Sequence, residues 1–224
     1  MDADKTLKTV DSLSSHLGSI YGLFLASLLG EFRVITTLSV NKLTPRAFAK
    51  IAFKSERETL STMLSLLSHQ LKDIENSLQG DAQEAFSEIM PDLLSKIKVA
   101  YQSQMAIDIA SAKSDLLRFT LSALRNVNTK GSMSAAIIAS QKSVTFKFVN
   151  RAGRRVNSES YIEVVTKYEI IKAIYYSFVI LAEMKGVDSL LLSDGKIIKL
   201  EEVSKFAHPN AKAIPVQAVK SQVT

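Results

Sequence analysis

The most concentrated group of side chains that could bind a ligand is a run of basic residues. Five Lys and Arg residues fall between positions 142 and 155, with no acidic residue among them. Guanidinium and ammonium groups bind phosphate oxygens, and a helix N-terminus just after such a cluster also favours anions. The pattern predicts a nucleic-acid or anion contact surface. With one more basic residue on the following helix, the candidates are Lys142, Lys147, Arg151, Arg154, Arg155 and Lys167.

The same charges have a second interpretation, which the sequence leaves open. Arg151 and Arg155 could pair with Glu159, Glu163 or Glu169 and so orient the helix. The turn holds no aromatic residue that could stack on bases, so recognition of specific single-stranded sequences is not indicated.

Evidence for catalysis is poor in this sequence. It contains no P-loop, GxSxG, HExxH or dinucleotide fingerprint, and Asp194 is better explained by a turn than by acid–base work. The absence of Cys excludes disulfides, thiolate zinc sites and a Cys nucleophile, and the three His residues lie far apart. We expect no enzyme, no cofactor and no bound metal.

The elements that must position the basic cluster are a strand before it and a helix after it. Residues 143–149 alternate in polarity, and residues 150–156 should turn, with Gly153 supplying a positive φ angle. Asn157 or Ser158 should cap a helix that runs to Lys185.

A β-hairpin should follow that helix. Gly186 is a suitable C′ residue, and Asp194-Gly195 should form the turn between strands 190–192 and 197–200. Tyr161, Tyr168 and Tyr175 are spaced by seven along the helix, so we expect them to line a core or an interface rather than a cofactor site.

The first 130 residues read as long helices. Residues 4–40 repeat apolar residues at helical spacing, Thr44-Pro45 is a strong helix start for a helix to about Ser77, and Asp81 could cap a third helix. Breaks near Ser55 and at Pro91 are possible. A stripe of small residues allows close packing in a helical bundle, which we favour, or self-association. The stripe consists of Gly18, Gly22, Ala26 and Gly30.

Composition agrees with a folded, mainly helical chain. Of its 224 residues 46% are apolar and 7% aromatic, and it holds only 8 Gly and 4 Pro. The predicted fold is mainly α, with a long-helix N-terminal region and a small α+β C-terminal region of strand, basic turn, long helix and β-hairpin. We expect a helical assembly region over 1–130, a small α+β domain over 131–206 and a flexible basic tail over 207–224.

Charge and hydropathy limit the partners. The net charge of +6 is compatible with nucleic acid or an acidic protein surface. The opening residues lack a basic leader pattern, and the apolar stretch within 17–40 is interrupted by Glu31 and Arg33. We therefore expect a buried helix there rather than membrane contact.

Residues 130–200 resemble the C-terminal signature of minor head (minor capsid) proteins of tailed bacteriophages. In that family a short strand ends in an aromatic and a hydrophobic residue, and a basic residue, a Gly-Arg pair and a capped helix follow. The matching residues here are Phe148-Val149, Arg151, Gly153-Arg154 and Ser158–Tyr161, and Gly186-Val187-Asp188 fits the entry to the next strand. Two departures are Lys167-Tyr168, where the family commonly has Arg-Thr, and the absence of a later segment with His and Cys.

The resemblance implies a structural protein of the virion, made in the host cytoplasm and held in the capsid interior or at the portal vertex. Its partners would be portal or capsid proteins and double-stranded DNA bound with low specificity. Ejection with the genome and self-association stay open. The alternatives are a small nuclease that uses the basic residues and a membrane-active ejection protein that uses residues 17–40.

Overall fold

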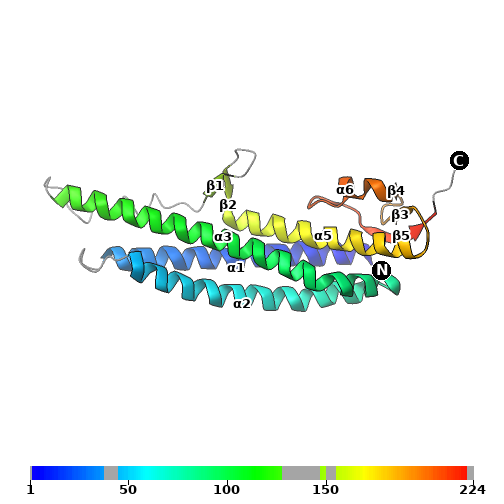
Figure 1. Cartoon of the computed structure of the whole chain (residues 1–224), viewed down its shortest axis with the longest axis horizontal. Coiled ribbons are helices and arrows are strands. Elements are labelled where there is room, and N and C mark those ends of the chain that lie inside the picture. The colour runs from blue at the N-terminus through cyan, green and yellow to red at the C-terminus, as the bar shows by residue number, and fades with distance from the viewer. Residues whose placement is uncertain (1, 38–44, 128–146, 150–154, 221–224) are drawn as a thin grey trace. The chain divides into compact units, whose positions relative to one another are not determined.

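The computed structural model describes residues 2–37, 45–127, 147–149 and 155–220. Four long helices dominate it: α1 (Ala3–Thr37), α2 (Pro45–Ser77), α3 (Asp81–Val127) and α5 (Ser158–Met184) (Figure 1). The predicted mainly-α class, with helices first and a small strand-containing part after them, is confirmed.

The first three helices begin where their sequences direct. Asp2 accepts a hydrogen bond on its carboxylate from the backbone N–H of Lys5, which satisfies a free donor of the first turn of α1. Pro45 is the first residue of α2, where a missing N–H has no cost. Gly80, at φ +56°, makes the turn from α2 into α3.

Two possible helix breaks do not occur. The structure continues α2 through Ser55 and α3 through Pro91. Pro91 removes only one backbone hydrogen bond, and Phe86 and Leu93 on either side of it are both buried. Packing on both sides of the proline outweighs that local loss.

The chain forms two compact units, each assembled from separate stretches. Unit 1 contains residues 1–18, 63–100 and 162–224, and unit 2 contains residues 19–62 and 101–161. Both units draw on the N-terminal helices and on the C-terminal region. This grouping differs from the expected division into consecutive domains.

Unit 1 packs segments of all four long helices around an aliphatic core. Thr6 and Ser77 hydrogen bond between α1 and α2, and Lys185, directly after α5, pairs with Asp81 at the start of α3. The buried side chains recur at three- and four-residue spacing, as one buried face of each helix requires. They include Leu13, Leu17, Met63, Leu67, Leu71, Phe86, Ile97, Ile170 and Ile174.

A three-stranded antiparallel sheet completes unit 1 at the C-terminal end of α5 (Figure 1). Its order is β4 (Ile197–Lys199), β3 (Ser189–Leu192), β5 (Pro215–Val219), with η2 (Leu200–Glu202) and α6 (Val203–Phe206) after β4. The β3–β4 hairpin around Asp194-Gly195 is confirmed. The expectation of a flexible tail after residue 206 is wrong for residues 207–220, because Ile214 is fully buried and β5 pairs with β3.

Unit 2 contains the later part of α1, the early part of α2, the later part of α3 and the first residues of α5. It also contains a two-stranded antiparallel hairpin, β1 (Lys147–Val149) and β2 (Arg155–Asn157), which leads directly into α5 (Figure 1). Its core is richer in aromatic side chains than the core of unit 1. The fully or almost fully buried residues there include Tyr21, Phe24, Phe48, Tyr101 and Met105.

Candidate functional site

The basic cluster lies partly on the β1–β2 hairpin. Lys147 is in β1 and Arg155 in β2, so residues 155 and 156 belong to a strand and not to the predicted turn. Backbone pairing with β1 explains the difference, because it extends the strand up to the helix cap. Lys142, Arg151, Gly153 and Arg154 lie outside the described residues.

Strand register brings two of the basic positions to one face of the hairpin. Lys147 is opposite Asn157, and Arg155 is opposite Val149. Directly opposed residues and residues two apart share a face of a β-ribbon, so positions 147 and 155 are diagonal neighbours on that face. Asn157 then accepts a hydrogen bond from the N–H of Glu159 and caps α5, as predicted.

Lys167 does not belong to a free basic surface. It lies in unit 1, where its ammonium group pairs with the carboxylate of Asp11 on α1. Its side chain is 24% exposed. The predicted role of Lys167 in anion contact is therefore weakened, since its charge is already compensated.

Two of the glutamates considered as partners for the arginines pack over glycines of α1. Glu163 packs over Gly18 in unit 1, and Glu159 packs over Gly22 in unit 2. A Cβ atom at position 18 would be 2.5 Å from the Glu163 Cγ. The glycines thus allow close packing within the helical part of the protein, as the favoured interpretation predicts. The other two stripe positions, Ala26 and Gly30, are exposed.

The predicted turn glycines at the C-terminal end are confirmed. Gly186 has φ +62° and Gly195 has φ +84°, both in the region that favours glycine. The N–H of Gly186 bonds to the carbonyl of Glu183, and the N–H of Val187 bonds to that of Ala182. This pair is the Schellman motif, and it ends α5.

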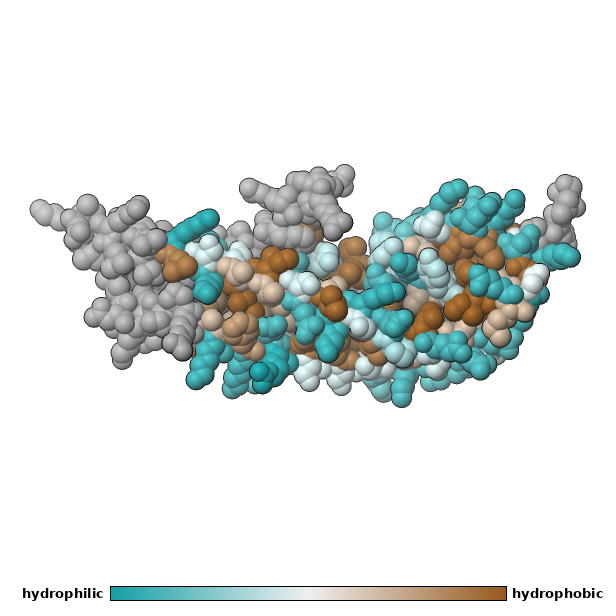
Figure 2. Space-filling view, in the orientation of Figure 1, coloured by the Kyte–Doolittle hydropathy of each residue, from teal (hydrophilic) through white to brown (hydrophobic). Residues whose placement is uncertain are grey.

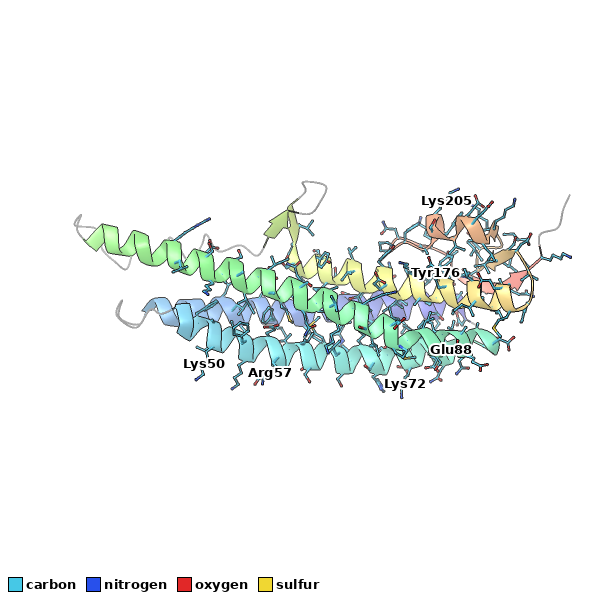
Figure 3. The ribbon with its side chains drawn as sticks, viewed as in Figure 1. Lys50, Arg57, Lys72, Glu88, Tyr176 and Lys205 are labelled. Carbon is cyan, nitrogen blue, oxygen red and sulfur yellow. The ribbon has the colours of Figure 1, made fainter. Side chains whose placement is uncertain are left out.

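A groove between α3 and α5 is a candidate binding site of unit 1. Its volume is about 320 Å³, with an apolar floor and a charged rim. Tyr176, at one side of it, is 45% exposed and is labelled on α5 in Figure 3. Figure 2 shows apolar surface between hydrophilic side chains where α5 approaches its C-terminal end. The lining residues are Ile89, Asp92, Leu93, Lys96, Glu169, Lys172, Ala173, Tyr176 and Ile180.

The rim of this groove carries two charges of each sign. Across the part of the chain that the structure describes, Asp92, Lys96, Glu169 and Lys172 form no ion pair. The Lys172 ammonium lies 5.6 Å from the Tyr168 ring centre and 5.8 Å from that of Tyr176. These cation–π contacts hold Lys172 at the groove and leave its hydrogen-bond donors available.

Sequence reasoning did not find the groove. The sequence predicts that Tyr161, Tyr168 and Tyr175 line a core or an interface, which holds for the buried Tyr175. Residues of α3 and α5 are far apart in sequence, and their charges are ordinary for exposed helix faces. The one feature of the sequence that could have pointed to this groove is the placement of Tyr168 and Tyr176 on either side of Lys172.

Unit 2 contains a buried polar cluster centred on Asp108 of α3. One carboxylate oxygen accepts hydrogen bonds from the Ser158 hydroxyl at 2.9 Å and the Gln104 amide at 3.3 Å, and the other accepts from the Tyr21 hydroxyl at 2.6 Å. Gln104 and Ser158 also bond to each other at 3.1 Å. All four residues are at most 2% exposed.

Burial dominates the acid–base behaviour of this cluster. Loss of solvent raises the pKa of Asp108 above its usual 3.8, and the three donated hydrogen bonds lower it again by less. Loss of solvent, with the Asp108 charge next in importance, also raises the pKa of Tyr21 well above its usual 10.0. Tyr21 is therefore a protonated donor throughout the neutral range.

In the described residues, no group of three or more His, Cys, Asp or Glu side chains is arranged to hold a metal ion. One described segment, Ala3–Gly30, is long and apolar enough to cross a membrane, with 44% of the relevant window buried. Core helices of soluble proteins meet the same criterion. No protein-family model, curated protein or solved structure matches the chain.

Proposed function

We propose that the chain is a structural minor head protein of a tailed phage, located in the capsid near the portal, with a hairpin that contacts packaged DNA. The supporting observation is the order β1, β2, α5, β3. A short basic hairpin leads into a capped long helix, which ends at Gly186 before the next strand. The resemblance in the sequence rested on the order strand, basic turn, capped helix and strand, and β2 is an addition to that order.

Phosphate contact by the hairpin rests on positions 147 and 155. Two basic residues on one face of a short ribbon, followed by a helix N-terminus, suit the backbone of duplex DNA better than base edges. Such binding is of low sequence specificity and falls with salt, because each neutralised phosphate releases counterions.

The α3–α5 groove supports contact with a head protein. An apolar floor with charges of both signs at the rim suits a protein segment that carries apolar side chains flanked by charges. Tyr176 would be the main anchor, since exposed tyrosines commonly dominate such interfaces. Cross-linking from a photoreactive residue at position 176 in assembled particles would identify the partner, and a Tyr176→Glu chain that enters virions normally would contradict this contact.

DNA binding is tested with two matched double variants. Lys147→Ala/Arg155→Ala removes one Lys and one Arg from the hairpin, and Arg57→Ala/Lys72→Ala removes the same charges from exposed positions of α2 (Figure 3). The hairpin variant should reduce the slope of log K against log salt by about 2, at about 0.9 per phosphate contact. The α2 variant should leave the slope unchanged. Equal slopes for the two variants, or no binding at low salt, would contradict DNA contact.

Location in the virion requires a separate measurement. Mass spectrometry of purified virions should find the chain at a constant copy number well below that of the major capsid protein. Its absence from virions would overturn the head-protein assignment, whatever the DNA result.

A further inference from the structure

The Asp108 cluster joins three helices that are far apart in sequence. Tyr21 comes from α1, Gln104 and Asp108 from α3, and Ser158 is the first residue of α5. Ser158 directly follows β2, so its hydrogen bonds fix the point where the basic hairpin becomes a helix. None of these groups is needed for the function proposed above.

Among the described residues, the groups named as acting on the Asp108 carboxyl are two hydroxyls and an amide, and none of them is a base. Facing Asp108 are the Tyr21 hydroxyl from α1, the Ser158 hydroxyl from α5 and the Gln104 amide from α3 itself. From α2, Glu56 adds a negative charge that acts on Tyr21. Each described contact is thus neutral or of the same sign as the Asp108 carboxylate.

A buried carboxylate in this setting is costly. Hydrogen bonds replace part of its lost hydration, but a buried charge without a counter-charge keeps a net penalty. The protonated carboxyl avoids that penalty and still bonds, since the acid proton can be donated to the Tyr21 or Ser158 oxygen.

We propose that Asp108 is a pH-sensitive latch that holds the start of α5, and with it the β1–β2 hairpin, against α1 and α3 more tightly when the acid is protonated than when it is ionised. The basic hairpin positions are then held most firmly in acidic conditions. As the pH rises, the buried negative charge loosens the first turn of α5.

The direction follows from proton binding. The pKa of Asp108 is raised in the folded protein, so the folded state binds more protons than the unfolded state between the unfolded and folded pKa values. The contribution of Asp108 to stability is therefore most favourable below the unfolded pKa, and it decreases as pH rises through the folded pKa. Each unit between the two pKa values corresponds to a tenfold change in the opening equilibrium.

The test is amide hydrogen exchange of the intact chain from pH 4 to 8, corrected for intrinsic rates. The amides of the first two turns of α5 should lose protection as the pH rises over this range, relative to the amides of Gly186 and Val187 at the other end of the helix. Asp108→Asn should abolish the pH-dependent part. Asp73→Asn, at an exposed position of α2, should retain it.

A second variant keeps the test decisive if Asp108→Asn does not fold. The Tyr21 hydrogen bond lowers the pKa of Asp108, so Tyr21→Phe should move the midpoint of the loosening to higher pH. Parallel pH profiles for the wild-type and Asp108→Asn chains would overturn the latch. So would an unmoved midpoint in Tyr21→Phe.

Discussion

The hydroxyl of Tyr175 donates a 3.0 Å hydrogen bond to the carbonyl oxygen of Ala213. It joins α5 to the segment that enters β5, a separation of 38 residues, inside a buried environment. Burial, with the charge of Asp194 as the smaller cause, raises the pKa of Tyr175 to about 12. The hydroxyl therefore remains a donor at all physiological pH values.

Tyr175→Phe should destabilise the protein by about 1–3 kcal/mol, because it leaves a buried carbonyl without its donor. Urea unfolding near pH 7 measures this. Tyr176→Phe, at a 45% exposed position one residue later, is the control and should change stability little. Since the folded pKa of Tyr175 lies above its usual 10.0, the wild-type advantage should shrink between pH 10 and about 12. Equal stability of the two variants would show that the bond contributes nothing.

Ile214→Ala should destabilise unit 1 by about 2–5 kcal/mol, the usual cost of truncating a fully buried isoleucine. Ile197→Ala truncates the same side chain where it is 52% exposed, and it should cost less than about 0.5 kcal/mol. Chemical denaturation measures the loss of stability in both variants, and a much larger loss for Ile214→Ala would show that the C-terminal segment is folded. Similar small effects would indicate that residues after 206 do not pack as described.

Glycine-to-alanine changes at two positions should have opposite signs. Gly186→Ala places a Cβ at φ +62° and should cost about 1–2 kcal/mol. Gly30→Ala, in helical backbone of α1 with nothing within 4 Å of the new Cβ, should stabilise by about 0.5–1 kcal/mol. Thermal or urea unfolding gives both values. Effects of the same sign would contradict a positive φ at Gly186 or helical backbone with open space at Gly30.

Gly18 and Glu163 should be energetically coupled. Gly18→Ala favours the helix intrinsically, but its Cβ would lie 2.5 Å from the Glu163 Cγ, and overpacking costs about 1–3 kcal/mol. The substitution should therefore destabilise the wild-type chain and stabilise a Glu163→Ala chain. A double-mutant cycle measures the coupling, and additive effects would mean that the two residues do not touch.

Local signals predicted the helical elements well. Thr44-Pro45 marked the start of α2, Asn157 the cap of α5 and Gly186 its end, because caps and positive φ angles depend on neighbouring residues alone. Strand β2 was missed because three residues beside a basic turn carry no periodic signal. The segment around β5 was read as a tail because its Pro, Ala and Lys residues say nothing about the β3 edge that it pairs with.

The candidate sites were less predictable than the fold. The partners of Asp108 lie 87 and 50 residues away in Tyr21 and Ser158, and single-sequence periodicity does not report such distances. Lys167 was predicted as an anion contact because Asp11, its partner, is on another helix and far away in sequence. Charge density predicts a basic contact segment, but whether each charge is compensated depends on tertiary packing.

The two units are interleaved along the chain, so neither can be obtained as a simple fragment. Unit 1 is assembled from three stretches and unit 2 from two, so no single peptide-bond cleavage releases either unit as a continuous polypeptide. Residues 1–18 must also wait for residues 162–224 to be synthesised before unit 1 is complete. On the ribosome, unit 2 can be completed once residue 161 has emerged, whereas unit 1 must wait for residues 162–224, so unit 2 should mature before unit 1.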